Sequence, residues 1–306
     1  MRVTNQSLLQ GYLNNLNRNL TNMVKYQDQM ASGKEIRRPS DDPFAVTRVM
    51  SLHTSINQNE QYLRNIEDSL GWVDMTDSAL GNIGDIMNRL RELVIKGANG
   101  TQGDSELNAI KSEVEQLVGQ IAQIGNTNYD GRYIFGGQDT INPPFDVDAD
   151  NVLIYNGASG PGKEMLTREI SQNVTIHINV PGTWIMVGKD ENRITAALSE
   201  TLSGIINALE SGDGETLGGP LLGQLDDHIN NILSLRAEMG AKYNRLEAAK
   251  LKNEEETLNM TELLSKTEDV DIAEKAMEYA MMSAVYQASL AMGARILQPT
   301  LLDFLR

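Results

Sequence analysis

Residues 9–30 read LQGYLNNLNRNLTNMVKYQDQM, and their apolar side chains recur at alternating intervals of four and three residues. This spacing places them along one narrow stripe of an α-helix, which is the pattern that paired helices bury in a coiled coil. Ser32 and Gly33 end the pattern. The N-terminal segment is therefore predicted to be a helix that needs a partner, with a stripe formed by Leu9, Leu13, Leu16, Leu20 and Met23.

The C-terminal part of the chain repeats this spacing with smaller side chains, at Met277, Met281, Ala284, Ala288 and Ala291. Small residues permit close helix approach but bury little apolar area, which is worth about 25 cal/mol per Å². We expect the first and last helices to pair with each other and to need further neighbours in an assembly. The predicted assembly interface consists of both stripes together with Leu301, Leu302 and Leu305.

Further helical stripes lie between these ends. Asp42 and Pro43 are typical of an N-cap and a first helical residue, and Asp104 is predicted to cap another helix. Isolated stripes are unstable in water, so helices from the two halves of the chain should pack together. The sequence predicts a mainly α fold in an elongated, nested helical rod, with helical patterns over residues 63–94, 107–124, 194–209 and 225–260.

The helical pattern is interrupted between residues 132 and 190. Apolar and polar residues alternate from Val174 to Val180, which predicts a half-buried strand. Val152–Tyr155 and Trp184–Val187 are shorter strand candidates. We therefore expect a small β insertion. The predicted domains are residues 1–40 with 270–306 as a coiled-coil assembly domain, 41–131 with 191–269 as a helical domain, and 132–190 as the β insertion.

Composition excludes several classes of function. The chain of 306 residues has no cysteine and three histidines, so disulfides, zinc fingers and iron–sulfur clusters are ruled out. Its net charge of −16 argues against nucleic-acid binding. Residues 1–40 carry six Lys or Arg against two acidic residues, and residues 276–306 carry two of each, so the negative charge lies in between. Tyr279–Ala294 is uncharged but too short for a membrane span.

Two motifs imitate ligand sites. Gly157–Lys163 has the glycine spacing of a phosphate-binding loop, but Glu164 stands where a hydroxyl should bind magnesium. Asp146, Asp148 and Asp150 resemble the start of a calcium loop that lacks its glycine and its bidentate glutamate, so a weak cation site is the alternative to a solvated turn. We expect turns at both places, and neither a cofactor nor an enzymatic activity.

Other candidate residues have ordinary structural explanations. His228 follows Asp226 and Asp227, and we expect it on a solvated helix surface because adjacent helical residues do not face one another. Arg91 and Arg236 lie at stripe positions, either in buried ion pairs or with charged ends reaching water. Most methionines, including Met277 and Met281, are expected in the core or between paired helices, with an adaptable docking surface as the alternative.

Several blocks of sequence resemble the bacterial flagellin-like proteins. They cover nearly the whole chain outside the insertion and keep the order of that family. The blocks are Ser32-Gly33 with Arg38-Pro-Ser-Asp-Asp-Pro43, Arg91-Glu-Leu-Val94 with Ala98-Asn-Gly-Thr101, Asn128-Tyr-Asp-Gly-Arg-Tyr-Ile-Phe-Gly-Gly137, Gly240-Ala-Lys-Tyr-Asn-Arg-Leu-Glu247 and Leu297-Gln-Pro-Thr-Leu-Leu-Asp-Phe-Leu-Arg306.

The resemblance implies a non-enzymatic structural subunit of the extracellular flagellum, exported through the flagellar type III apparatus without a cleaved signal. Within the family, the Asp-Asp-Pro helix start and the Tyr-Ile-Phe-Gly-Gly block favour a subunit that joins hook to filament. The implied partners are hook-associated protein 1, flagellin, copies of the chain in a ring-like layer, and an export chaperone that shields the last helix.

Three alternatives remain. A short flagellin would form the filament itself. An enzyme would use the Gly157–Lys163 loop to bind a nucleotide. A secreted translocator would act on host membranes through Tyr279–Ala294.

Overall fold

The computed structural model describes residues 5–99, 103–160, 162–189, 194 and 196–296. The chain forms two compact units, considered separately here. The terminal unit comprises Met1–Gln58 and Glu256–Arg306, and the central unit comprises Asn59–Glu255. The helices and strands are α1 (Asn5–Ser32), α2 (Pro43–Ala98), α3 (Asp104–Gly125), β1 (Asn128–Tyr129), β2 (Arg132–Tyr133), β3 (Phe145–Val147), β4 (Leu153–Tyr155), β5 (Thr167–Ser171), β6 (Val174–His177), α4 (Gly182–Met186), α5 (Leu198–Ser211), α6 (Gly214–Thr216), the π-helix η1 (Leu217–Leu221), α7 (Leu222–Glu268) and α8 (Ile272–Ile296).

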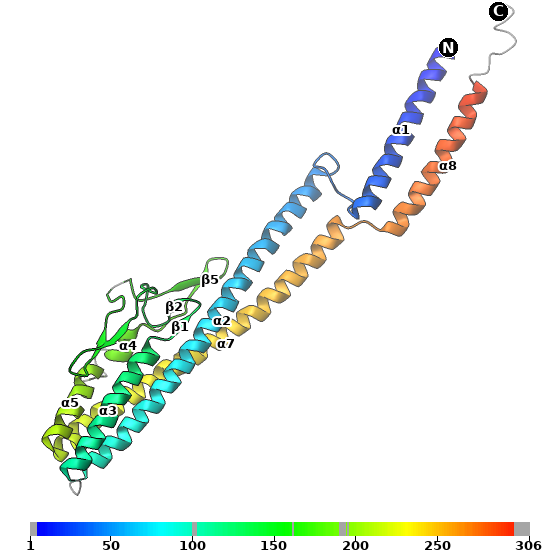
Figure 1. Cartoon of the computed structure of the whole chain (residues 1–306). Helices are drawn as coiled ribbons and strands as arrows, with labels where there is room; N and C mark the ends of the chain where they lie inside the picture. The colour runs from blue at the N-terminus through cyan, green and yellow to red at the C-terminus, as the bar shows by residue number, and fades with distance from the viewer. Residues whose placement is uncertain (1–4, 100–102, 161, 190–193, 195, 297–306) are drawn as a thin grey trace, which may run out of the picture. The chain divides into compact units, whose positions relative to one another are not determined.

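In the terminal unit, α1 and α8 lie side by side (Figure 1). Tyr12 contacts the C-terminal half of α8, whereas Tyr26 lies near Lys275 at its start, so the two helices are antiparallel. The mainly helical fold, its small β insertion and the pairing of the first and last helices are confirmed. The finer division at residues 40, 131, 190 and 269 stays a prediction.

The core of the central unit lies between α2, α3, α5 and α7 (Figure 1) and continues into the β insertion, where Phe135, Phe145 and Leu153 belong to the same buried cluster. The expected apolar stripes form it, and ion pairs such as Lys250–Glu67 and Arg91–Asp226 show that α2 and α7 run antiparallel. Among its fully or almost fully buried side chains are Ile66, Leu80, Met87, Val94, Val114, Ile121, Leu198, Leu202, Leu225, Ile232, Met239 and Leu246.

The β insertion consists, in its described residues, of three two-stranded antiparallel hairpins. Asp130 and Gly131 join β1 to β2 with φ angles of 49° and 76°, which suit a two-residue hairpin turn. Asn179 is fully buried and connects the segment after β6 to the one before β5. Its Oδ1 accepts the N–H of Leu166 at 2.8 Å, and its Nδ2 donates to the carbonyl of Glu164 at 2.6 Å.

The start of α2 confirms the predicted cap. Asp42 Oδ1 accepts the N–H groups of Phe44 and Ala45 at 2.9 and 3.0 Å, and Pro43 is the first helical residue. For α3 the prediction is wrong by one position. Gly103 is the N-cap and Asp104 is the first helical residue, where its charge still favours the helix N-terminus.

The strand predictions have mixed outcomes. β4 covers the last three residues of the predicted Val152–Tyr155 strand, and β6 covers the first four residues of the predicted Val174–Val180 strand. The strand predicted at Trp184–Val187 is wrong, because residues 182–186 form α4. A short apolar run fits a strand or a buried helix equally well. Here Pro181 is the N-cap of a short helix, and the backbone N–H of Trp184 donates to the Pro181 carbonyl at 3.0 Å.

Two glycines of α3 test the packing of the insertion on this helix. A Cβ on Gly125 would lie 2.5 Å from the ring of Phe145, whereas a Cβ on Gly119 would meet nothing within 4 Å. We expect Gly125→Ala to destabilise the central unit by about 1–3 kcal/mol through overpacking. Gly119→Ala, the matched control, should stabilise it by about 0.5–1 kcal/mol. Urea unfolding followed by circular dichroism measures both, and a stabilised Gly125→Ala would contradict the packing.

Candidate assembly interface

The α1–α8 pair forms through one face of α8. Residues on that face recur at intervals of four and three, and all of them are buried or half-buried. Tyr12 Oη donates to the Ser289 carbonyl at 3.1 Å, and its ring packs where Gly293 has no side chain. The ammonium of Lys275 lies 5.7 Å from the ring centroid of Tyr26. The face consists of Lys275, Tyr279, Met282, Tyr286, Ser289 and Gly293.

The stripe predicted on α8 lies on the opposite side of the helix. Because a helix has 3.6 residues per turn, positions 277, 284, 288 and 291 point away from the face that meets α1. Met277 and Met281 are 67% and 64% exposed, and Ala284, Ala288 and Ala291 are exposed as well. The prediction that these two methionines lie in the core or between paired helices is therefore wrong for this chain alone, and they form part of an open surface.

Some residues of the stripe predicted on α1 are partly buried, and the others are exposed to solvent. Leu9, Leu16 and Met23 are half-buried, while Leu13 and Leu20 are exposed. The terminal helix pair thus leaves apolar side chains uncovered on both of its helices. Leu301, Leu302 and Leu305 lie outside the described residues.

The two connections at the base of the helix pair bind to each other. Gly33 ends α1 with a φ of 70°, and its carbonyl accepts the N–H of Val270 at 3.0 Å. The N–H of Glu35 donates to the Glu268 carbonyl at 2.7 Å, so that Lys34 and Asp269 form an antiparallel bridge. The chain leaving α1 and the chain entering α8 are thereby held together.

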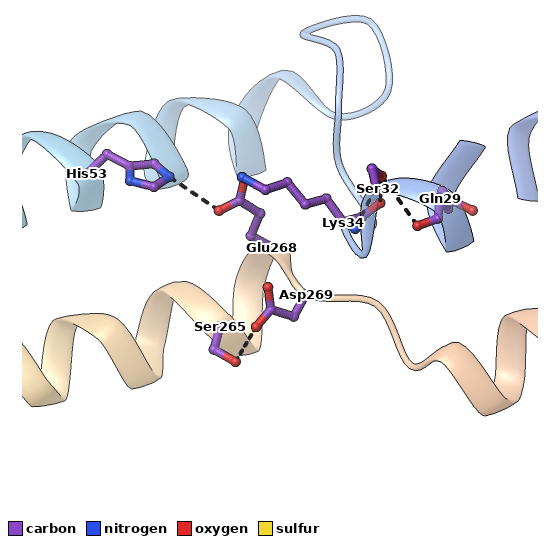
Figure 2. Close-up of polar contacts among 7 residues, drawn as sticks. All are labelled: Gln29, Ser32, Lys34, His53, Ser265, Glu268 and Asp269. Atoms are coloured by element: carbon purple, nitrogen blue, oxygen red, sulfur yellow. Dashed lines mark hydrogen bonds and ion pairs between the residues drawn. The ribbon is translucent and has the colours of Figure 1, made fainter. Parts of the chain in front are cut away.

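Glu268, the last residue of α7, is the polar centre of this junction. It is 7% exposed, and its two carboxylate oxygens have different partners (Figure 2). Lys34 Nζ lies 2.5 Å from Oε1, and His53 Nε2 lies 3.2 Å from Oε2. A buried carboxylate is stable only when it is paired and hydrogen-bonded. Glu268 therefore ties the α1–α2 connection, the first turns of α2 and the end of α7 to one another.

Neighbouring polar side chains complete the junction. Gln29 is buried, and its Nε2 donates to the Glu35 carbonyl at 2.8 Å. Ser265 Oγ donates to Asp269 Oδ2 at 2.6 Å (Figure 2). Asp271 Oδ1 accepts the N–H groups of Ala273 and Glu274 and so caps the start of α8. These bonds determine where α7 ends and α8 begins.

Sequence patterns do not identify the residues of this junction. Glu268 and Lys34 are separated by 234 positions, and neither belongs to an apolar stripe or a recognisable motif. The only local signal was the break after Ser32-Gly33, which marks a helix end but not its partner.

The first motif that imitates a ligand site lies in a connection, as expected, whereas the aspartates of the second belong to the β3–β4 hairpin. The expected turn is wrong for Asp146, which lies in β3, while Asp148 and Asp150 lie between β3 and β4. The described residues of Gly157–Lys163 lie between β4 and β5, and Pro161 lies outside the described residues. The element that follows is β5 and not a helix, and Glu164 Oε1 accepts the N–H of Gly160 at 3.2 Å. Asp146 and Asp148 each bond to the N–H of the following residue. Among the described residues, no group of three His, Asp or Glu side chains is arranged to hold a metal ion.

Of the three remaining candidate residues, Arg91 and Arg236 lie as expected and His228 does not. Arg91 and Arg236 form ion pairs with Asp226 and Asp77 in which every partner is about 40% exposed, so their charged ends do reach water. His228 is 1% exposed, and its predicted place on a solvated surface is wrong. It faces α5, which covers this side of α7. Within the described part of the chain, no helix has the length and hydrophobicity that crossing a bilayer requires.

The Glu268 junction can be tested with two lysines of the terminal unit. Lys34→Met removes the ammonium from a buried carboxylate and should lower the free energy of opening of α1 and α8 by about 1–2 kcal/mol. Lys266→Met is the control, because Lys266 and Glu262 are both more than 60% exposed and such pairs contribute only a few tenths of a kcal/mol. Hydrogen exchange of α1 and α8 peptides measures the difference. Equal effects of the two substitutions would contradict the role of Glu268.

Comparisons with known proteins agree on one family. The bacterial flagellin N-terminal helical region matches residues 3–140, and the C-terminal helical region matches residues 222–305. Flagellar hook-associated protein 3 of Escherichia coli (strain K12) is 27% identical over 307 residues, covering 94% of this chain and 95% of that protein. Flagellin of Bacillus subtilis (strain 168) is 26% identical over 301 residues, covering 96% of each.

A solved structure supports the fold. Flagellar hook associated protein-3 from Legionella pneumophila superposes with a TM-score of 0.63 at 16% identity, covering 71% of this chain and 98% of that one. The two matched regions include all of α1, α2, α3, α7 and α8, which are the helices that build both units. The chain belongs to the bacterial flagellin family of structural flagellar proteins.

Proposed function

We propose that this chain is the structural subunit at the hook–filament junction of the bacterial flagellum, where it links hook-associated protein 1 to the flagellin filament. The observation that carries the proposal is the similarity to flagellar hook-associated protein 3 along nearly the full length of both chains. The similarity to flagellin, of nearly equal extent, favours one alternative, a short flagellin that forms the filament itself.

The uncovered face of the terminal helix pair supports an assembly role. Met277 and Met281 expose most of their surface, and the alanines beside them let another helix approach closely. Burying a methionine side chain fully is worth about 1.5–3 kcal/mol. We infer that neighbouring subunits cover this stripe and the exposed leucines of α1, with Leu301, Leu302 and Leu305 as further contacts.

The proposed partners follow from this position. Hook-associated protein 1 lies on one side, flagellin lies on the other, and copies of this chain surround each subunit in a ring-like layer. Contacts between successive layers are head-to-tail, as helical arrays require. The subunit acts outside the cell after export through the flagellar type III apparatus, with a chaperone shielding the last helix until assembly.

The function proposed here is mechanical and involves no catalysis. Low charge and small side chains near the C-terminus make the last helix dependent on its neighbours. Its open face is covered only on assembly, so neighbouring subunits supply part of the free energy that keeps this helix ordered.

Deleting the gene and examining cells by electron microscopy separates the two candidates. For a junction subunit we expect cells with hooks but no filaments, and flagellin shed into the medium. Reintroducing the gene should restore the filaments. If the chain were a flagellin, purified protein would form long filaments alone, and that result would overturn the junction assignment.

The exposed stripe can be tested separately. In the Met277→Glu/Met281→Glu variant, two carboxylates would have to be buried on assembly, so complementation of the deletion strain should fall at least tenfold, as measured by counting filaments per cell. The α1–α8 contacts lie on the other face and should persist in circular dichroism spectra. The control is Ile141→Glu, an apolar position outside the stripe that is 82% exposed. Normal filaments in the double variant would exclude the stripe from the interface.

A further inference from the structure

His228 is a buried titratable group that the proposed function does not use. It lies on α7 in the central unit, is 1% exposed, and is covered by the residues that begin α5. Its Nε2 lies 3.1 Å from the Ala196 carbonyl and 3.4 Å from Thr201 Oγ1. A carbonyl can only accept, so Nε2 carries the proton. The ring is neutral, and Nδ1 is its unprotonated nitrogen.

Nδ1 is sealed from solvent. It is buried and finds no hydrogen-bond partner among the described residues. Protonating it would create a positive charge and an N–H donor for which this part of the structure offers no acceptor. Burying an unpaired charge is among the most costly changes in a protein interior.

The charged groups around the ring offset this cost only in part. Asp227 precedes His228 on α7 and favours a positive ring. Asp226 on α7 is paired with Arg91 of α2. On α5, Glu200 bonds to the N–H of Ala197, and the positive end of the helix dipole disfavours a cation at this place.

We propose that His228 makes the packing of α5 on α7 sensitive to acid, because only the neutral ring is stable in this buried place. The protonated ring would carry a charge and an Nδ1–H without an acceptor, and both are hydrated only when α5 moves away from α7. The contact is a small part of the interface, but it sits where α5 begins. Leu198 and Leu202 follow directly and are almost fully buried. Opening at His228 would therefore expose the apolar face of α5 to water.

The direction of the pH effect follows from the burial of the ring. Desolvation lowers the pKa of His228 below its ordinary value of 6.5, while the bond to Ala196 and the charge of Asp227 raise it by less. The unfolded chain therefore takes up this proton more readily than the folded one. The stability supplied by the neutral ring is complete above pH 6.5 and declines as the pH falls below that value.

Hydrogen exchange of α5 in the full chain between pH 8 and 5, corrected for intrinsic exchange rates, tests the proposal. The opening constant of α5 should rise by up to about tenfold per pH unit below pH 6.5. In His228→Gln the amide still donates to Ala196 but does not titrate, so this rise should disappear. His177→Gln is the control, because His177 is exposed and bonds only to Thr167 among the described residues. An equal rise in His228→Gln would overturn the proposal.

A second measurement does not depend on the folding of a variant. NMR titration of the wild-type His228 ring should show that it stays neutral until α5 opens. If the His228 ring took up its proton while the amide protons of α5 stayed protected from exchange, the proposal would be wrong.

Discussion

The structure depends on the fact that an amphipathic helix cannot leave its apolar stripe in water. The long helices of this chain pack against helices that are distant in sequence, and the α8 stripe that includes Met277 and Met281 is left exposed. In the terminal unit α1 meets α8, and in the central unit α2 runs antiparallel to α7 while α3 and α5 add to the same core. The burial is unequal. The stripes of the central unit are almost fully covered, whereas the α1–α8 pair covers only one face of each helix.

Buried polar groups determine where this packing begins and ends. Glu268 is the last residue of α7, and its carboxylate binds Lys34 and His53. The backbone bridge between Lys34 and Asp269 holds the chain that leaves α1 against the chain that enters α8. Asn179 plays a comparable part in the insertion, where its amide satisfies two backbone groups that would otherwise be buried without partners. Because an unsatisfied polar group in the interior is costly, each of these residues permits only a narrow range of arrangements around it.

The last helix shows why the site was harder to predict than the fold. Two sets of residues on α8 have the same spacing of four and three. One set, which includes Met277 and Ala284, looks like a coiled-coil stripe but faces away from α1. The other set includes Lys275, Tyr286 and Ser289, whose polar atoms conceal that it packs against α1. Periodicity identifies the helix, but the choice of face depends on Tyr12 meeting Gly293, a contact between opposite ends of the chain.

The sequence by itself determined the long helices, their caps at Asp42 and Gly33, the turns of the insertion and the resemblance to the flagellin family, but not the short helix α4, where it predicted a strand. These features are local, because spacing, glycine conformation and side-chain capping act within a few residues. Tertiary structure alone decided the open face of α8, the Glu268 junction and the burial of His228 beneath α5. Each of these depends on which distant segment of the chain packs or pairs with it. Such a contact does not alter the local sequence pattern around either partner, so the pattern does not predict it.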